Sequence, residues 1–389
     1  MSSINALKDQ FYLQEGLTFL NFGSFGACPR PIMQRYQALQ IEMERDPVAF
    51  IVKKGIKYLA DSRSVLGKYI GCDSEDLVYI PNPTYAVNLI AKNLDLRPND
   101  EILSTNIEYG ACDRTWEYYC KKIGAKYIRK KIDLPLNNAD LFVANFMQGV
   151  NHRTRLIFLS HITSSTALIL PVEKIIHEAK LRGIPVFIDG AHVPGHIPLN
   201  ITALDPEYYT GACHKWMMTP KGSSFLYVKK GLQYQLDPLI ISWGYNSLFP
   251  SSSQFLDYHQ MNGTRDYTAY LTIPEAVQFM KENQWSEQAK ICRKLCHENV
   301  AELCSILHAK PLTENNEIFT GQMYSAEIRT NDPEKLHDNL LHRFQIQIPV
   351  MTQDDQLYLR YSINVFNSQK DLNHLFEAIH LLKKQKLIE

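Results

Sequence analysis

The order of apolar and polar positions between residues 56 and 230 predicts strands that alternate with helices. Short apolar runs, typical of buried strands, occur at DLVYI, EILSTN, RLIFLSH, IPVFID and SSFLYVKK, and helical spacing appears in TYAVNLIAKNL and VEKIIHEAKLRG. Such an alternation forms a mostly parallel sheet with helices on both faces. Because ligands of these sheets bind beyond the carboxyl ends of the strands, polar residues at those ends are the candidates for chemistry.

A second, smaller unit follows. Residues 270–310 predict one long helix that leads into it, MYSAEIRT and QLYLRYSI predict strands, and LNHLFEAIHLLKKQ predicts a terminal helix. We therefore expect an α/β protein with an N-terminal arm at 1–20 that packs on the small domain, a large domain at 21–268 with a mostly parallel sheet flanked by helices, and a small C-terminal α/β domain at 269–389.

Composition excludes several classes of protein. The chain has 389 residues, of which 45% are hydrophobic and 21% charged, as in a compact globular protein. Acidic and basic residues balance at 41 each and form no long basic stripe, so we expect no nucleic-acid partner. The N-terminal sequence lacks the pattern of an export signal and no stretch is apolar enough to span a bilayer, so we expect a cytoplasmic protein with no membrane partner.

The eight cysteines are dispersed, and in the cytoplasm we expect them to be reduced. Cys292 and Cys296, followed by His297, share one helical face and are a possible metal site. No second ligand pair lies at the spacing of a zinc site, so a plain helix with buried thiols is the better interpretation and we expect no metal.

The most informative segment is YTGACHKWMMTPKG, which places Lys215 between His214 and Trp216 in a loop after a strand. In IPVFIDGAHVPG, another strand ends at Asp189, with Gly190 in the turn and His192 after it. Asp189 alone is often just a helix cap. About 26 residues separate Asp189 from Lys215, the length of one strand-helix-strand step, so the two side chains are expected at the same edge of the sheet.

An amine and a carboxylate at one sheet edge suit a specific cofactor. An amine in an apolar pocket has a lowered pKa and forms a Schiff base with an aldehyde. A buried aspartate holds a pyridine nitrogen in its protonated state, and the charged ring then withdraws electrons from a substrate carbanion. The pair indicates pyridoxal phosphate.

Other strand ends offer the remaining contacts that this cofactor needs. Thr84 is placed at the N-cap of a helix, where its hydroxyl and the backbone N–H groups of Tyr85 and Ala86 could hold a phosphate. Tyr109 follows a strand and could stack on a ring, although an aromatic there is more often part of the core. The hydroxyls of Thr163 and Ser164 could reach the ring, although such hydroxyls are also common in turns.

Eight segments occur in the order found in the class V (fold type I) pyridoxal-phosphate enzymes, and they resemble the family of isopenicillin N epimerase and its relatives: LNFGSFGACPRP, NPTYAVN, EYGACDRTW, HITSSTALILPV, FIDGAHVPG, GACHKWMMTPKG, NGTRDYT and LRYSINVFN. The resemblance covers nearly the whole chain. It implies a fold type I architecture, pyridoxal 5′-phosphate as cofactor, an amino acid as substrate and a homodimer with active sites at the subunit interface.

The resemblance also implies a role for each matching residue. Lys215 matches the lysine that links covalently to the cofactor, Asp189 the partner of the pyridine nitrogen and His192 the histidine beside the ring. The further cofactor contacts that it implies are Thr84, Tyr85, Tyr109, Ser164, His214 and Thr264, the last reaching the phosphate of the opposite subunit. Arg360 matches the arginine that pairs with the substrate α-carboxylate, as a guanidinium can through two hydrogen bonds.

Two positions depart from the family pattern. Phe22 stands where relatives often have histidine, and Tyr85 where they often have threonine. Phe22 and its neighbour Asn21 are expected on the substrate side, where Phe22 would alter the shape available to the substrate or remove a polar contact. The departures bear on the substrate and not on the cofactor.

The first step of the family's chemistry makes the α-proton of an amino acid acidic, and the same site then permits epimerisation, β-elimination or transamination. Persulfide-forming desulfurisation needs a thiol near the carboxylate arginine, and no cysteine follows Cys304. Epimerase-like chemistry is the first expectation, with Tyr85 and Tyr109 as candidates for the second acid. A C–S lyase or an aminotransferase is the alternative. A non-catalytic binding protein is disfavoured because Lys215 and Asp189 are both present.

Overall fold

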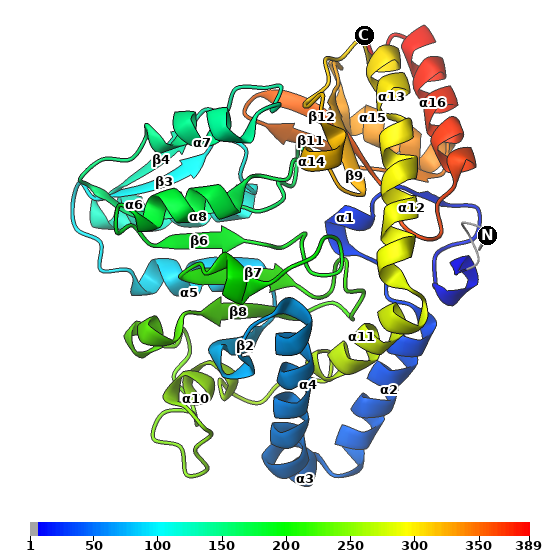
Figure 1. Ribbon diagram of the computed structural model, residues 1–389. Coiled ribbons are helices and arrows are strands. Elements are labelled where there is room, and N and C mark those ends of the chain that lie inside the picture. The colour runs from blue at the N-terminus through cyan, green and yellow to red at the C-terminus, as the bar shows by residue number, and fades with distance from the viewer. Residues whose placement is uncertain (1–6) are drawn as a thin grey trace.

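The computed structural model describes residues 7–389, and its centre is a seven-stranded sheet (Figure 1). The strands run in the order β2-β8-β7-β6-β5-β3-β4. Strand β8 is antiparallel to its neighbours β2 and β7, and the other pairs are parallel. The bounds are β2 Leu77–Ile80, β3 Glu101–Thr105, β4 Lys126–Lys130, β5 Thr154–Ser160, β6 Val186–Asp189, β7 Tyr208–Ala212 and β8 Ser224–Val228. The expected α/β fold with a mostly parallel sheet is confirmed.

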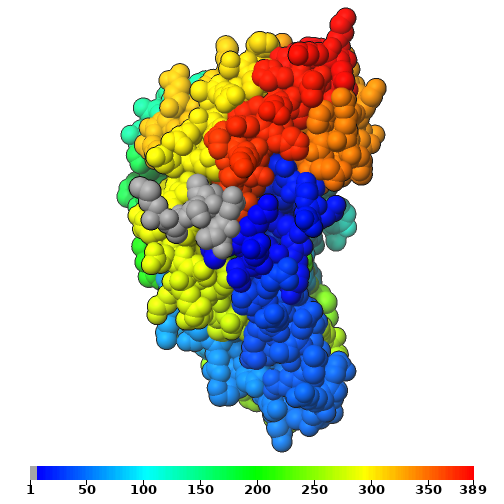
Figure 2. Space-filling model, turned by 90° about the vertical axis from the view of Figure 1, so that its right-hand side faces the viewer, coloured from blue at the N-terminus to red at the C-terminus, as the bar shows by residue number. Residues whose placement is uncertain are grey.

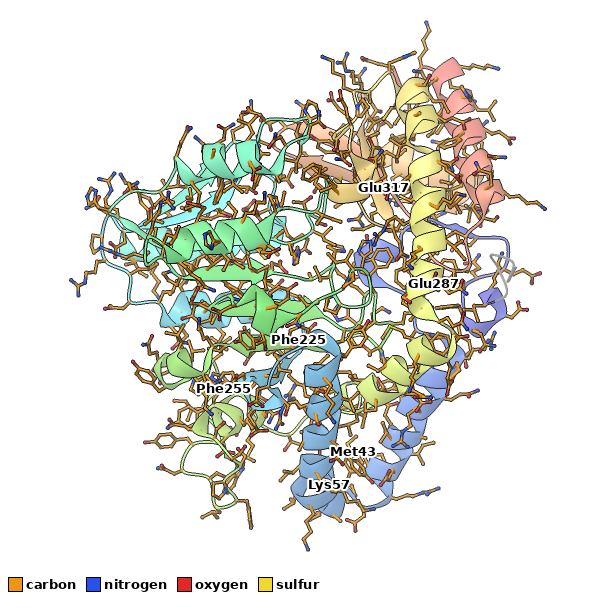
Figure 3. The ribbon with its side chains drawn as sticks, viewed as in Figure 1. Met43, Lys57, Phe225, Phe255, Glu287 and Glu317 are labelled. Carbon is orange, nitrogen blue, oxygen red and sulfur yellow. The ribbon has the colours of Figure 1, made fainter. Side chains whose placement is uncertain are left out.

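Alternate side chains of each central strand enter two different apolar cores. Leu156 and Phe158 of β5 belong to one core, whereas Ile157 and Leu159 belong to the other. The same division separates Phe225 of β8 from Phe255 of helix α10, both labelled in Figure 3. Because helices cover both faces, these strands are apolar on both sides and appear in the sequence as continuous apolar runs.

The helices of this part of the chain cover the sheet and extend beyond it. Their bounds are α1 Phe22–Phe25, α2 Arg30–Arg45, α3 Pro47–Ala49, η2 Phe50–Lys54, α4 Gly55–Ile70, η3 Ser74–Asp76, α5 Pro83–Asn93, α6 Gly110–Ile123, α7 Ala139–Met147, α8 Val172–Lys180, α9 Ile201–Leu204, η4 Lys230–Gln235, α10 Gln254–Gln260 and η5 Tyr270–Thr272.

A second sheet of three antiparallel strands, β11-β12-β9, forms beside the first. Its strands are β9 Met323–Glu327, β11 Val350–Gln353 and β12 Gln356–Ser362, as expected from MYSAEIRT and QLYLRYSI for two of them. The surrounding helices are α11 Ile273–Glu282, α12 Trp285–Glu298, α13 Val300–Leu307, α14 Asn316–Phe319, α15 Pro333–Asp338, η6 Asn339–Arg343 and the terminal α16 Gln369–Lys384.

The N-terminal part of the described chain lies against this second sheet region. After η1 (Lys8–Gln10), strand β1 (Thr18–Phe19) pairs in parallel with β10 (Ile346–Gln347), and the Thr18 hydroxyl lies 3.1 Å from Nδ1 of His374 on α16. Figure 2 shows the N-terminal segment beside α16. Residues 1–6 of the expected arm lie outside the described residues, and the domain boundaries after residues 20 and 268 stay a prediction.

The single long helix expected at 270–310 is wrong. The segment forms three helices, α11, α12 and α13, because Gln284 adopts a left-handed backbone with φ 49° and the chain turns again at Asn299. The apolar spacing continues across both breaks, so the pattern alone resembles one helix. Cys292 and Cys296 lie buried on α12, as expected for a plain helix.

The expected N-cap of the helix in NPTYAVN is also wrong. Asn82 is the N-cap of α5, with Pro83 as the first helical residue, and its side-chain oxygen accepts a hydrogen bond from the Tyr85 N–H at 2.9 Å. The Tyr85 N–H is therefore not free, and Thr84 lies in the first turn. Asparagine at the cap followed by proline is a common start of a helix.

No helix in residues 7–389 is long and apolar enough to cross a membrane.

Candidate active site

Lys215 lies in the turn after β7, half-buried, with its Nζ 3.2 Å from Nε2 of His192. Burial lowers the pKa of Lys215 to about 8, and the positive charge of Arg360 acts in the same direction, while Asp189 opposes it. A lysine with this pKa has a substantial neutral fraction at physiological pH, and the neutral amine is the nucleophile.

Two glycines shape this turn. A Cβ on Gly26, whose φ is +66°, would lie 2.5 Å from the backbone oxygen of His214 and 2.6 Å from that of Lys215. A Cβ on Gly195, whose φ is +85°, would overlap the Trp216 backbone. The motifs LNFGSFG and DGAHVPG therefore contain glycine where two chain segments pack directly on the lysine loop.

Asp189 ends β6, the strand next to β7, so it emerges beside the lysine loop as expected. Its side chain is 3% exposed, and its Oδ1 accepts the Ala191 N–H at 2.9 Å while the Cys112 thiol donates to Oδ2 at 3.5 Å. Burial raises the pKa of Asp189, and nearby Lys215 counteracts this. These two donors leave a buried carboxylate incompletely satisfied, which suits a cationic ring N–H.

His192 is buried and connects the lysine to the protein core. Its Nδ1 accepts a hydrogen bond from Trp216 Nε1 at 3.5 Å, which assigns the ring proton to the Nε2 that faces Lys215. Burial, together with the charge of Lys215, holds the pKa of His192 well below its usual range. His196 stacks on Trp216 with ring centroids 3.9 Å apart. The histidine beside the lysine is therefore neutral and fixed in orientation.

Arg360, on β12, is fully buried. Within residues 7–389 its hydrogen bonds go to the backbone oxygen and hydroxyl of Ser164, at 2.6 and 3.4 Å from Nη1, and to the Ser24 hydroxyl at 3.1 Å from Nη2. Its Nε has no partner there. Burial lowers the pKa of Arg360 to about 10. A buried guanidinium without a carboxylate partner has the charge and geometry to bind one.

Three residues were expected to contact the phosphate: Thr84, His214 and Thr264. Thr84 is in the first turn of α5, and its backbone oxygen accepts from Asn88 at 2.9 Å. His214 Nδ1 lies 2.9 Å from the Ser223 oxygen, and burial lowers the pKa of His214 to about 4. Thr264 is exposed in the loop after α10, and no described contact brings it to this site within one chain.

The two tyrosines differ in their surroundings. Tyr109 is the N-cap residue of α6 and is 46% exposed, so its ring is available for stacking. Tyr85, in the first turn of α5, is partly buried. Desolvation raises the pKa of Tyr109.

The structure does not support a direct substrate contact for Phe22. Its side chain has no exposed surface and packs on Trp216 and Phe366, with ring centroids 5.0 and 5.9 Å away. Phe22 therefore supports the lysine loop from behind. Asn21 is 8% exposed and accepts from the Ser24 hydroxyl at 2.5 Å, so it acts on Arg360 through Ser24. Thr163 bonds within its own turn, to Thr166 and Leu168.

Several residues of the site were missed from the sequence. Glu108, directly before Tyr109, is fully buried and accepts from the Ser160 N–H and hydroxyl at 2.8 and 2.6 Å. Ser160 is the sheet partner of Asp189. Burial raises the pKa of Glu108 to about 7. Glu108, Cys112 and Ser24 all lie in segments that the sequence marks, but only their contacts reveal what they do.

A lysine and a carboxylate at the carboxyl ends of a doubly covered sheet, together with a buried arginine from the neighbouring small sheet, define an α/β enzyme of the pyridoxal-phosphate type. The chain belongs to the aminotransferase class V family, whose model matches residues 32–375. Enzymes of this family use pyridoxal phosphate.

Three relatives illustrate the range of the family. The chain is 30% identical to isopenicillin N epimerase of Amycolatopsis lactamdurans, over 97% of this chain and 98% of that one. It is 26% identical to a probable chloroplastic L-cysteine desulfhydrase of Arabidopsis thaliana, over 93% and 82%. A C-DES mutant with glycine covalently linked to its PLP cofactor has the same fold, with a TM-score of 0.82, 21% identity and coverage of 95% and 98%.

We predict that, in the cofactor-free protein, the extent to which Lys215 reacts with an aldehyde rises with pH and is half of its maximum near pH 8. The neutral amine is the reactive form, and its fraction rises as the pH passes the pKa, which is about 8 for Lys215. The pKa of an ordinary lysine is about 10.4. Reductive labelling across the pH range, followed by peptide mapping, measures the midpoint. Arg360→Met removes a positive neighbour and should move the midpoint upward; a midpoint that stays in place would contradict the geometry.

Proposed function

We propose that the chain binds pyridoxal phosphate through Lys215 and acts at the α-carbon of an amino acid, with epimerisation as its first reaction type. The observation that carries the proposal is the buried Arg360 guanidinium, which has no carboxylate partner in residues 7–389 and whose charge reaches Lys215. An α-carboxylate bound at Arg360 would supply the missing charge and bring the α-carbon toward the lysine.

The residues present suit the cofactor. Asp189 has room for one further donor, which a protonated pyridine nitrogen supplies. Tyr109 offers an exposed ring for stacking, and Ser164 accepts hydrogen bonds from Arg360. Thr84 and His214 are assigned to the phosphate. When bound, the cofactor withdraws electrons from the α-carbon and so makes its proton acidic.

The protein's own groups divide the remaining work. Arg360 and Ser24 orient the carboxylate, and Lys215, neutral in part, takes the α-proton. The Nε2 of His192 lies 3.2 Å from Nζ of Lys215, and the lowered pKa of His192 keeps its ring uncharged. His192 therefore holds the amine in place and does not compete with it for the α-proton. Asp189 stabilises the positive ring nitrogen by its negative charge.

Epimerisation ranks first because the epimerase relative shows 30% identity over nearly its full length. A C–S lyase is the second candidate, because a relative with 26% identity is described as a probable L-cysteine desulfhydrase. Direct C–S elimination needs no enzyme thiol, and the cysteines of this chain end at Cys304. Transamination uses the same residues and stays an alternative.

We predict that Asp189→Asn retains bound cofactor and loses turnover by on the order of a hundredfold or more, since an amide cannot hold the ring nitrogen protonated. Retention is read from absorbance and turnover from the substrate found in an amino-acid screen. Asp205→Asn is the matched control, because Asp205 pairs with Lys180 and Lys229 on the surface. Wild-type turnover in Asp189→Asn would exclude the role assigned to Asp189.

The active species is proposed to be a homodimer, with Thr264 completing the phosphate site of the second subunit. Thr264 is exposed. In the segment before it, the exposed fractions of Trp243, Leu248 and Phe249 are 75%, 76% and 68%. The exposure of these apolar side chains supports the proposal that a partner subunit covers this surface. Sedimentation at several concentrations should show a dimer, and Thr264→Ala should weaken cofactor binding; a fully active monomer contradicts both.

Heavy water separates the three reaction types. We expect a responsive amino acid to exchange its α-hydrogen and lose optical purity without release of ammonia or keto acid, because one group removes the proton and a second returns it on the other face. Proton NMR and chiral chromatography measure both effects. Sulfide, pyruvate and ammonia from cysteine would establish β-elimination instead, and keto acid with an aminated cofactor would establish transamination. Exchange with full retention of configuration would remove the epimerase assignment only.

A further inference from the structure

Three side chains from the small sheet region converge on the turn Ser164–Ser165 of the large sheet region. Arg360 donates to the Ser164 backbone oxygen at 2.6 Å, and Ser325 donates to the Ser165 backbone oxygen at 2.5 Å. The Ser165 hydroxyl donates to Oε1 of Gln353 at 3.1 Å. All of these side chains are buried. The position of the Arg360 guanidinium therefore depends on how the small sheet meets the end of β5.

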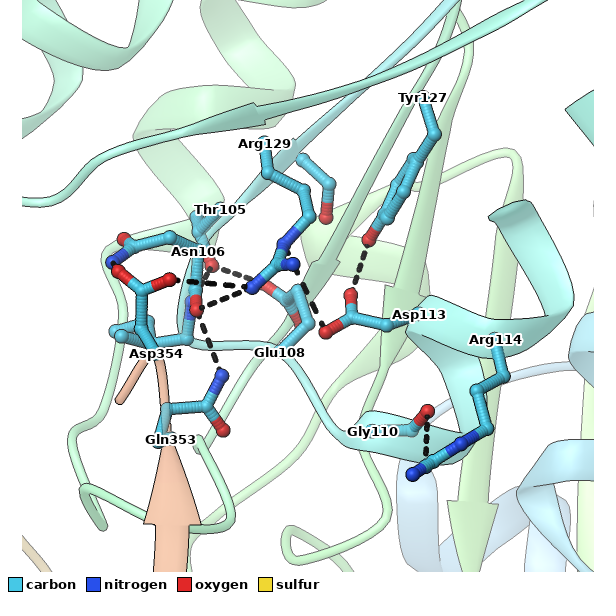
Figure 4. Close-up of polar contacts among 12 residues, drawn as sticks. Thr105, Asn106, Glu108, Gly110, Asp113, Arg114, Tyr127, Arg129, Gln353 and Asp354 are labelled. Atoms are coloured by element: carbon cyan, nitrogen blue, oxygen red, sulfur yellow. Dashed lines mark hydrogen bonds and ion pairs between the residues drawn. The ribbon is translucent and has the colours of Figure 1, made fainter. Parts of the chain in front are cut away.

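Gln353 also reaches a second strand end. Its Nε2 donates to the Asn106 backbone oxygen at 2.7 Å, just beyond β3, as Figure 4 shows. Strands β3 and β5 are neighbours, so this one side chain bonds to two adjacent strand ends. Asn106 stands three residues before Tyr109. Gln353 thus connects the segment that carries the stacking ring with the turn that holds Arg360.

The neighbouring contacts of the same hairpin are weaker. Asp354 accepts from Nδ2 of Asn106 at 2.9 Å and lies 3.7 Å from Arg129, but these ion-pair side chains are 46% and 32% exposed. Exposed pairs of this kind contribute little to stability. Loss of Gln353, which is 8% exposed, would instead leave the buried Ser165 hydroxyl without its acceptor and the Asn106 oxygen with only a longer contact from Arg129, at 3.4 Å.

The register of the hairpin transmits this contact to Arg360. Gln353 ends β11 and is paired with Gln356, the first residue of β12, and Arg360 follows four residues along the same strand. On its other side Arg360 is paired with Ser325 of β9, which bonds to the same turn. The strand that carries Arg360 therefore has a neighbour on each side, Gln353 on β11 and Ser325 on β9, whose side chain bonds to Ser165.

We propose that Gln353 is a positioning residue that sets Arg360 relative to Tyr109 and Lys215, and thereby the affinity for the α-carboxylate of the substrate. This inference rests on the proposed function, since it takes Arg360 as the carboxylate site. Gln353 touches neither substrate nor cofactor in this role.

Gln353→Met tests the proposal, because methionine has a similar length and lacks the amide. The matched control is Gln356→Met, which changes the exposed cross-strand neighbour on the same hairpin. The probes are L-alanine and ethylamine, which is alanine without its carboxylate. Binding is read from the absorbance of the cofactor-loaded protein, and hydrogen exchange of the peptides that contain Asn106–Tyr109 and Arg360 is measured in the cofactor-free protein.

We expect Gln353→Met to weaken L-alanine binding roughly threefold to tenfold, the effect of one or two hydrogen bonds, with ethylamine binding unchanged. The KM of the substrate should rise by a similar factor while kcat stays within about twofold, and both peptides should exchange faster. Gln356→Met should resemble the wild type in every measurement. Should Gln353→Met fold poorly, Ser165→Ala, which removes only the bond to Oε1, should give a smaller change in the same direction.

Equal losses for L-alanine and ethylamine, equal effects of both methionine variants, or unchanged exchange of the Arg360 peptide would each overturn the role of Gln353. Failure of the proposed function looks different, because the wild-type protein would then show no cofactor absorbance and no reducible lysine adduct. The hydrogen-exchange comparison decides the role of Gln353 in that case as well.

Discussion

The site depends on the cost of burying charged groups without partners of opposite charge. Lys215 and Asp189 lie at the end of the seven-stranded sheet, Arg360 comes from the three-stranded sheet, and burial shifts the pKa of each group toward its neutral form. Desolvation of this kind costs several kcal/mol per ion in real proteins unless partners offset it. In the proposed complex the ring nitrogen satisfies Asp189 and the substrate carboxylate satisfies Arg360. In this proposal the free protein therefore holds charges whose partners are ligands.

The rest of the fold keeps these groups from satisfying each other. Asp189 and Lys215 follow adjacent parallel strands, but the Ala191 N–H and the Cys112 thiol hold the carboxylate, and His192 holds the amine. Arg360 comes from the other sheet and is tied to a backbone oxygen of Ser164. Because neutral groups hold all three, each charge stays available. A site preorganised in this way can stabilise the charges of a bound ligand without a rearrangement of its own side chains.

Much of this was predictable from local pattern. The strand that ends at Asp189 is an apolar run, and the separation between Asp189 and Lys215 along the chain matches one crossover, so the adjacency of β6 and β7 follows from the topology. Thr84 was misplaced as a cap because Asn82 and Pro83 compete for the start of the same helix. The long helix at 270–310 was wrong because Gln284, without glycine or proline, breaks it through a left-handed backbone. Phe22 gave no sign of its burial, since packing on Trp216 is a tertiary contact.

Gln353, Ser24 and Glu108 lay beyond local prediction for a related reason. Each acts through partners distant in sequence or through strand register, and no spacing rule identifies a glutamine that bonds to two strand ends. Their types are also ambiguous, because glutamine, serine and glutamate are usually surface residues. Burial distinguishes Gln353 and Glu108, and the contact with Arg360 distinguishes Ser24; both are properties of the folded chain. The residues that carry charge were visible in the sequence, as were His192 and Ser164, whereas Gln353 and Ser24 were found only from their contacts.

The two proton-handling groups of the proposed site differ in what they can do. The amine of Lys215, with a pKa of about 8, exists in both forms near neutral pH and can take a proton or return it. The raised pKa of Tyr109 keeps its phenol protonated near neutral pH, so in this state it has a proton to donate, although the same shift makes it a weaker acid. Because Tyr109 is 46% exposed, water can replace the proton that it gives. An epimerase built on this pair would leave Lys215 protonated and Tyr109 deprotonated after one turnover, so proton exchange with water must reset both groups before the next turnover in the same direction.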